Sequence, residues 1–154
     1  MSLIDKNWEV WDNEALTTDK HSFTADNFFD MEEGGVTDEG LGEIWFNVQV
    51  GTPAGGMASG AILSVITSDA VDFSSGLICL GALGSVLAPL TAAMLTAKAR
   101  FSLAFPRWGL HKYLEVHWDV ISEAATGLTV DVWFGMRPLC PTGRLQKMAS
   151  GYTA

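Results

Sequence analysis

The feature that most constrains the fold of this chain is the alternation of apolar and polar side chains in several short segments. In residues 43–50, every second side chain is apolar: Ile44, Phe46, Val48 and Val50. Successive side chains of a β-strand point to opposite faces of the sheet, whereas a helix repeats every 3.6 residues. The segment is therefore predicted to be a half-buried strand.

Other segments share this pattern. Alternation recurs in residues 97–105, 113–121 and 128–134, shorter strands are expected at 8–11 and 23–29, and 61–67 is apolar on both faces. About eight short strands separated by turn signals, roughly ten residues apart, are typical of an all-β, antiparallel β-sandwich or jelly roll. The best helical candidate, 88–98, spans about two turns. The glycine-rich residues 51–60 are interpreted as a long hairpin loop.

The length of 154 residues fits a single domain. We expect a β jelly-roll domain at 1–136, with an acidic surface loop at 30–43, followed by an extended basic C-terminal arm at 137–154. Residues 1–43 hold 12 acidic and 2 basic side chains. Two interpretations of the loop stay open, a solvated surface or a patch that meets a basic partner. The arm is either disordered or ordered only by a partner.

Composition excludes several classes of protein. A net charge of −9 disfavours nucleic acid as a partner. Two cysteines, Cys79 and Cys140, suit neither a disulfide scaffold nor a zinc module. No secretory signal is visible at the start, so we expect synthesis and retention inside a cell. Residues 73–97 carry no charge, but glycines and a proline interrupt them, which favours packed strands and turns over a membrane span.

Candidate catalytic and metal-ligating residues are few. Glu115, His117 and Asp119 share one strand face, a spacing that would allow a divalent ion, but an ordinary polar face or interface contact is the interpretation we favour. His21 and His111 follow or precede lysines in turn-like positions. No nucleophile elbow or phosphate loop occurs. We therefore expect no metal, no cofactor and no enzymatic activity.

The six tryptophans suggest binding surfaces instead. Trp45 and Trp133 fall on faces opposite the main apolar rows, and Trp108 follows Arg107 at a strand end or turn. We favour anchors of a protein interface, for which tryptophan and arginine are typical. Packing in a second-sheet core and stacking against sugars are the other interpretations.

Four short blocks carry a resemblance to a known family: residues 1–6, the strand 62–69 running to Phe73 and Ser74, 101–106, and 113–116. In this order they resemble the capsid cement, or decoration, proteins of tailed bacteriophages, most of all the jelly-roll type first associated with a Bordetella phage. The match extends in order over most of the span 1–135, and each block within it is short. None of them is a catalytic signature.

The resemblance implies a viral structural protein on the outer surface of the virion capsid, synthesised in the host cytoplasm. Its partners would be the major capsid protein and further copies of itself, as a homodimer or homotrimer, and it would clamp neighbouring subunits of the DNA-filled head. No membrane partner is expected. We expect the arm to grip an adjacent subunit through Arg137, Arg144, Lys147 and Tyr152. The alternatives are a carbohydrate-binding β-sandwich and another head or tail component of the virion.

Overall fold

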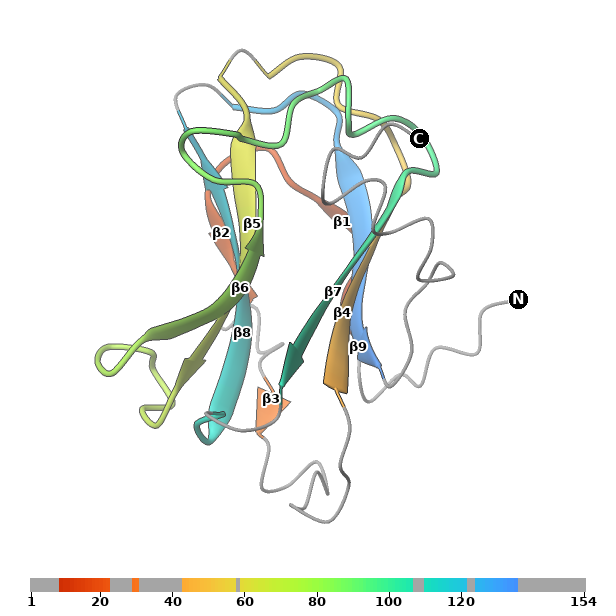
Figure 1. The fold of residues 1–154 in the computed structure, drawn as a ribbon. Helices are drawn as coiled ribbons and strands as arrows, with labels where there is room; N and C mark the ends of the chain where they lie inside the picture. The colour runs from red at the N-terminus through yellow and green to blue at the C-terminus, as the bar shows by residue number, and fades with distance from the viewer. Residues whose placement is uncertain are drawn as a thin grey trace.

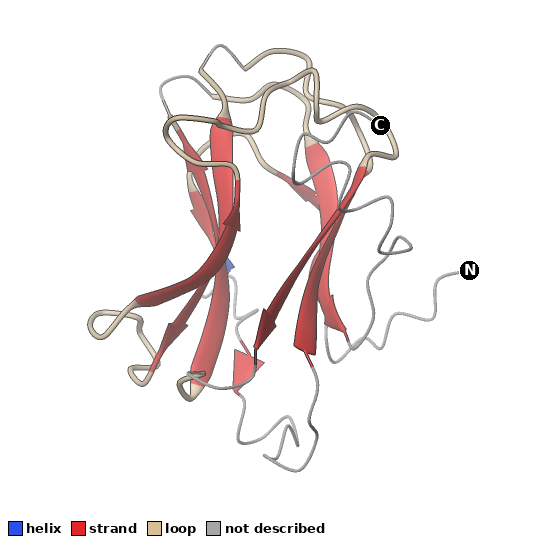
Figure 2. Ribbon diagram, viewed as in Figure 1, coloured by secondary structure: helices blue, strands red, loops and turns tan. Residues whose placement is uncertain are grey.

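The computed structural model describes residues 9–22, 29–30, 43–57, 59–106, 110–121 and 124–135. Nine strands in these ranges form two antiparallel sheets that lie face to face, as Figures 1 and 2 show. The prediction of an all-β sandwich is confirmed.

Each sheet combines strands from distant parts of the chain. The first sheet, sheet A, has the order β1 (Glu9–Ala15), β9 (Thr129–Gly135), β4 (Glu43–Val50) and β7 (Arg100–Pro106). The second, sheet B, has the order β2 (Lys20–His21), β8 (Tyr113–Val120), β5 (Ala61–Ser68) and β6 (Ile78–Leu83), and β3 (Phe29–Asp30) also pairs with β8. Among these strands, only the consecutive pair β5 and β6 forms a hairpin within one sheet, so most connections cross the sandwich.

The core lies between the sheets and follows the predicted alternation. All four apolar side chains expected to point inward from β4 are buried: Ile44, Phe46, Val48 and Val50. Phe134 of β9 packs against aromatic rings of β4 and β7, with ring centroids 5.8 Å from Phe46 and 6.0 Å from Phe105. Strand β5 lies between β8 and β6 and is buried at seven of its eight positions, as its apolar character on both faces predicted.

The prediction of a hairpin at residues 51–60 is wrong, because this segment joins β4 in sheet A to β5 in sheet B. Its backbone is held by the start of β9 and the segment before it: the Gly51 amide donates to Thr129 O at 2.9 Å, and the Gly55 amide donates to Thr126 O at 2.7 Å. Glycine-rich composition indicates a loop but does not reveal which sheet the next strand joins.

Residues 88–98 form a series of turns and not the helix considered from the sequence. Leu95 donates one helix-like bond to Thr91 O at 3.2 Å, but the flanking residues bond to strands: Leu90 N donates to Ala61 O at 2.8 Å, and Lys98 N donates to Val50 O at 2.9 Å. These bonds to distant strands replace the helical hydrogen bonds that would extend the turn.

Several expectations fall partly or wholly outside the described residues. Of the strand predicted at 23–29, only Phe29 is described, where it begins β3, and residues 23–28 lie outside the description. Residues 31–42 of the acidic loop and the whole arm 137–154 also lie outside it. The uncharged stretch 73–97 contains β6 and turns, as predicted. In the described part of the chain, no helix has the length and apolarity needed to cross a membrane.

Candidate functional site

Large apolar side chains are exposed around strand β6. We call them the β6 rim: Val71, Leu77, Ile78, Val86, Leu87 and Met94. Three of them precede or begin β6 and three lie in the connection from β6 to β7 (Figure 1). Leu87 is 97% exposed and Val86 is 73% exposed. The two groups lie at opposite ends of β6, because the loop before the strand and the connection after it are at opposite ends of the sandwich (Figure 1). Exposed apolar neighbours such as Val86 and Leu87 commonly mark surfaces that bind another macromolecule.

The edge position of β6 strengthens this interpretation. Among the described strands β6 pairs only with β5, so its outer backbone groups are not used by another strand of sheet B. The strand carries no charged residue, and the protection usual for edge strands is limited to a bulge in its pairing with β5, between Cys79 and Gly81. Leu103 of β7 packs against β6 at Gly81, where an added Cβ would lie 2.5 Å from its Cδ2 atom. An uncharged apolar edge of this kind suits contact with a further protein chain.

The two tryptophans predicted as interface anchors lie on one face of sheet A. Trp45 pairs with Gly135 of β9, and Trp133 pairs with Asn47 of β4, so the two indoles occupy diagonal positions on the face turned away from the core. Both are half-buried, and neither belongs to the core cluster. Beside them Ser102 donates a buried hydrogen bond to Asn47 Oδ1 at 2.6 Å. The second-sheet core interpretation is therefore wrong for these two residues, and a binding role stays open.

The remaining predicted interface residues lie outside the described part of the chain: Arg107, Trp108, Arg137, Arg144, Lys147 and Tyr152. Their contacts and the reach of the arm stay predictions.

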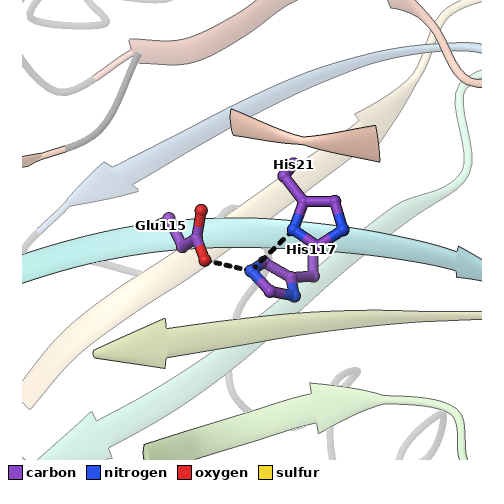
Figure 3. Close-up of side chains that lie close together, drawn as sticks. All are labelled: His21, Glu115 and His117. Atoms are coloured by element: carbon purple, nitrogen blue, oxygen red, sulfur yellow. Dashed lines mark hydrogen bonds and ion pairs between the residues drawn. The ribbon is translucent and has the colours of Figure 1, made fainter. Parts of the chain in front are cut away.

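A polar cluster lies on the face of sheet B that points away from the core. Glu115 and His117 project from β8, and His21 projects from β2 directly opposite His117 (Figure 3). We call these three residues the histidine–glutamate cluster. Sequence reasoning expected Glu115 and His117 to share a face, but it placed Asp119 beside them and did not include His21. The third member comes from a strand about a hundred residues earlier, and no spacing within β8 indicates it.

The atoms of this cluster converge closely. His21 Nδ1 lies 3.1 Å from His117 Nε2, and the ring centroids are 3.9 Å apart. His117 Nε2 also forms an ion pair or hydrogen bond with Glu115 Oε1. One ligand atom from each of the three residues lies within 4.8 Å of the others.

The prediction of an ordinary exposed polar face is wrong for Glu115. Its side chain is 0% exposed, and that of His117 is 12% exposed. The second carboxylate oxygen, Oε2, is buried and has no hydrogen-bond partner among the described residues. A buried carboxylate costs free energy unless it is paired with positive charge or coordinates a metal. Among the described residues, Glu115 is thus the charged side chain whose burial most needs compensation.

The third histidine takes part in a separate surface contact. His111 Nδ1 lies 2.7 Å from Asp69 Oδ2, and the Lys112 amide donates to Asp69 Oδ1 at 3.3 Å. The hydrogen bond from His111, followed by that from the Lys112 backbone, lowers the pKa of Asp69 below its ordinary value. This pair fixes the loop before β8 against the loop after β5, and it shares no residue with the histidine–glutamate cluster.

The sequence matches no protein-family model, and no curated protein is detectably similar to it. A function for this chain is therefore inferred from its fold and from the geometry of its surfaces.

Proposed function

We propose that this protein is a decoration protein that binds the outside of a bacteriophage capsid and stabilises it. The observation that carries the assignment is the strand order. Because β2 and β3 pair with β8 on the side away from β5, they count as one interrupted strand, and the fold then has eight strands. Sheet A takes the first, eighth, third and sixth, and sheet B the second, seventh, fourth and fifth. This order supports a jelly roll, an architecture that recurs in viral capsid and lectin domains.

The β6 rim provides a mode of attachment. Its apolar side chains and the edge of β6 would be buried against neighbouring subunits, and burial of apolar surface is the main favourable term in protein association. A protein that binds only the assembled shell stabilises that state by mass action. Weak contacts suffice, because each copy that touches two subunits gains from effective concentration. The short blocks that resemble cement proteins favour the same function.

Co-sedimentation with capsid particles tests this function. The protein is stripped from particles of its own phage, purified, and added back to these stripped particles. We expect saturable binding and increased resistance of the particles to heat. Val86→Glu combined with Leu87→Glu places two charges on the rim and should abolish binding. Thr17→Glu, an exposed position in the connection from β1 to β2, is the matched control and should bind normally. Failure of the unaltered protein to bind would overturn the assignment.

The arm is tested in the same assay by deletion of residues 137–154. We expect the number of bound copies to fall sharply if the arm grips an adjacent subunit, because loss of a second contact removes the gain from effective concentration. Unchanged occupancy would show that the arm does not contribute to attachment.

Carbohydrate binding is the second candidate, and the tryptophan pair on sheet A favours it. Two half-buried indoles at diagonal positions, Trp45 and Trp133, offer ring faces of the kind that stack on sugars. A glycan array distinguishes the two functions. Glycan binding that is lost in Trp45→Ala and Trp133→Ala, together with absence of capsid binding, would replace the decoration function with a lectin function.

A further inference from the structure

We propose that the histidine–glutamate cluster binds a divalent transition-metal ion of the zinc class, with His21, His117 and Glu115 as its three protein ligands. The site lies on sheet B at the junction of β2 and β8, apart from the β6 rim, and does not depend on the capsid function.

The donor atoms suit such an ion in type and spacing. Two imidazole nitrogens and a carboxylate oxygen are common zinc ligands, whereas calcium and magnesium prefer oxygen ligands alone. Zinc–nitrogen bonds of about 2.0–2.1 Å at tetrahedral angles place two ligand nitrogens about 3.3 Å apart. His21 Nδ1 and His117 Nε2 are 3.1 Å apart, close to this spacing. The two ring centroids are 3.9 Å apart, so the rings would swing apart to direct both lone pairs at one ion.

Within the cluster, His117 Nε2 faces two partners with a single hydrogen or lone pair. A ring nitrogen carries either one hydrogen or one lone pair. If His117 Nε2 carries a hydrogen and His21 Nδ1 does not, that one hydrogen is shared between two acceptors, His21 Nδ1 and Glu115 Oε1. If both ring nitrogens carry hydrogens, the two hydrogens face each other. If His117 Nε2 carries no hydrogen, its lone pair faces Glu115 Oε1, a contact that is favourable only when the carboxyl is protonated and donates. A cation at the point of convergence, by contrast, accepts a lone pair from each of the three residues.

The buried carboxylate is an independent indication of a cation. Glu115 has a fully buried side chain, and its Oε2 atom has no hydrogen-bond partner among the described residues. Removal of a carboxylate from water is compensated in proteins by pairing or by metal coordination. An ion held by either oxygen supplies positive charge to the carboxylate whether or not His117 is protonated, and three protein ligands leave the fourth position of a tetrahedral ion to water.

The ion would also stabilise the edge of sheet B. Strand β2 is two residues long and pairs with β8 only through Lys20 with Trp118 and His21 with His117. Ligands from both strands would fix the chain at the place where it crosses from sheet A to sheet B. Because the imidazoles must be unprotonated to bind, metal binding releases protons and weakens in acid.

Calorimetric titration of the full-length, tag-free, chelator-treated protein with zinc chloride tests the site. We expect one equivalent of zinc per chain and a rise in the melting temperature that chelator reverses. His21→Ala and Glu115→Gln should each lower the affinity at least tenfold. His111→Ala is the matched control, since His111 pairs with Asp69 elsewhere, and it should bind as the unaltered protein does.

A second measurement keeps the test decisive if a variant fails to fold. In the unaltered protein, zinc should shift the imidazole NMR resonances of His21 and His117 and leave those of His111 unchanged. Absence of saturable zinc binding to the unaltered protein, full retention of binding in both variants, or zinc shifts confined to His111 would each overturn the site.

Discussion

The two edges of sheet B show opposite ways of ending a sheet. At one edge, β2 covers β8 with a polar cluster in which the Glu115 carboxylate is fully buried. At the other edge, β6 carries no charge and is surrounded by exposed apolar side chains, of which Leu87 is almost completely exposed. The first edge places a charged group where water is absent, and the second places apolar groups in water.

Both arrangements cost free energy in the isolated chain, and each therefore indicates a partner of a different kind. A buried carboxylate is stabilised by positive charge, so the β2 edge favours a cation. Exposed apolar groups are stabilised by removal from water, so the β6 edge favours another protein surface. The two proposals thus place a ligand site and a docking surface at opposite edges of the same sheet.

The largest expected effect is at the polar edge. His117→Leu leaves the buried Glu115 carboxylate without its ion-pair partner, and the loss of one member of a buried pair costs about 3–5 kcal/mol. We expect the free energy of unfolding of the metal-free protein, measured by urea denaturation, to fall by about 3 kcal/mol.

The double variant with Glu115→Leu and His117→Leu is the control, because it removes the whole pair. It should recover most of the lost stability. If His117→Leu lowers the free energy of unfolding by less than about 1 kcal/mol, Glu115 is not held as a charged group. The contrast between the two edges would then disappear.

The next effect concerns the support of the apolar edge. Gly60 precedes β5 with φ of +85°, and an added Cβ would lie 2.7 Å from Leu90 O and 2.6 Å from Pro89 Cβ. Gly60→Ala should therefore lower the free energy of unfolding by about 2–3 kcal/mol, through backbone strain and displacement of the β6 to β7 connection.

Gly76→Ala separates these two causes. Gly76 also has a positive φ, +65°, but an added Cβ would meet no atom within 4 Å. It should cost about 1 kcal/mol from backbone strain alone. Equal losses at both glycines would mean that crowding against Pro89 and Leu90 contributes nothing.

Local sequence patterns predicted the interior of the sandwich well because burial there follows the strand period. Apolar and polar side chains alternate in residues 43–50 because neighbouring side chains of a strand point to opposite faces of the sheet. The same rule correctly placed Trp45 and Trp133 away from the core.

The same rule failed where a distant segment decides the environment. The pattern of β8 marks Glu115 as solvent-facing, yet its side chain is fully buried, and its cluster includes His21 from β2. Pairing of β2 with β8 joins residues 96 positions apart, which no local periodicity encodes. The connection at 51–60 failed for a related reason, since a glycine-rich loop does not specify the sheet that the next strand joins.

The exposed rim should contribute little to folding. Leu87 is 97% exposed, so Leu87→Glu removes almost no buried apolar area and should change the free energy of unfolding by no more than about 0.5 kcal/mol. Self-association, followed by sedimentation at increasing protein concentration, should fall. A large loss of stability would mean that the rim residues contribute to the folded state itself. The two edges would then be more alike in their contribution to stability than their exposure suggests.

The smallest effect is a pH dependence in the loop that leads to the apolar edge. The hydrogen bond from His111, then that from the Lys112 backbone, lowers the pKa of Asp69 below its ordinary 3.8. A carboxyl whose pKa is lower in the folded than in the unfolded state stabilises the fold above the unfolded value, and this contribution is lost as the pH falls through the folded value. Because Asp69 is exposed, the contribution is small.

NMR titration of the two carboxyl groups in this loop measures the effect. Asp72 has its pKa lowered by hydrogen bonds from Ser74 and not by a histidine, so it serves as an internal control. We expect His111→Ala to raise the pKa of Asp69 and to leave that of Asp72 unchanged, and we expect unaltered protein and Asp69→Asn to approach equal stability in strong acid. If His111→Ala shifts the pKa values of both Asp69 and Asp72, the loop as a whole has moved. The pair of His111 and Asp69 then helps to hold the apolar edge in place.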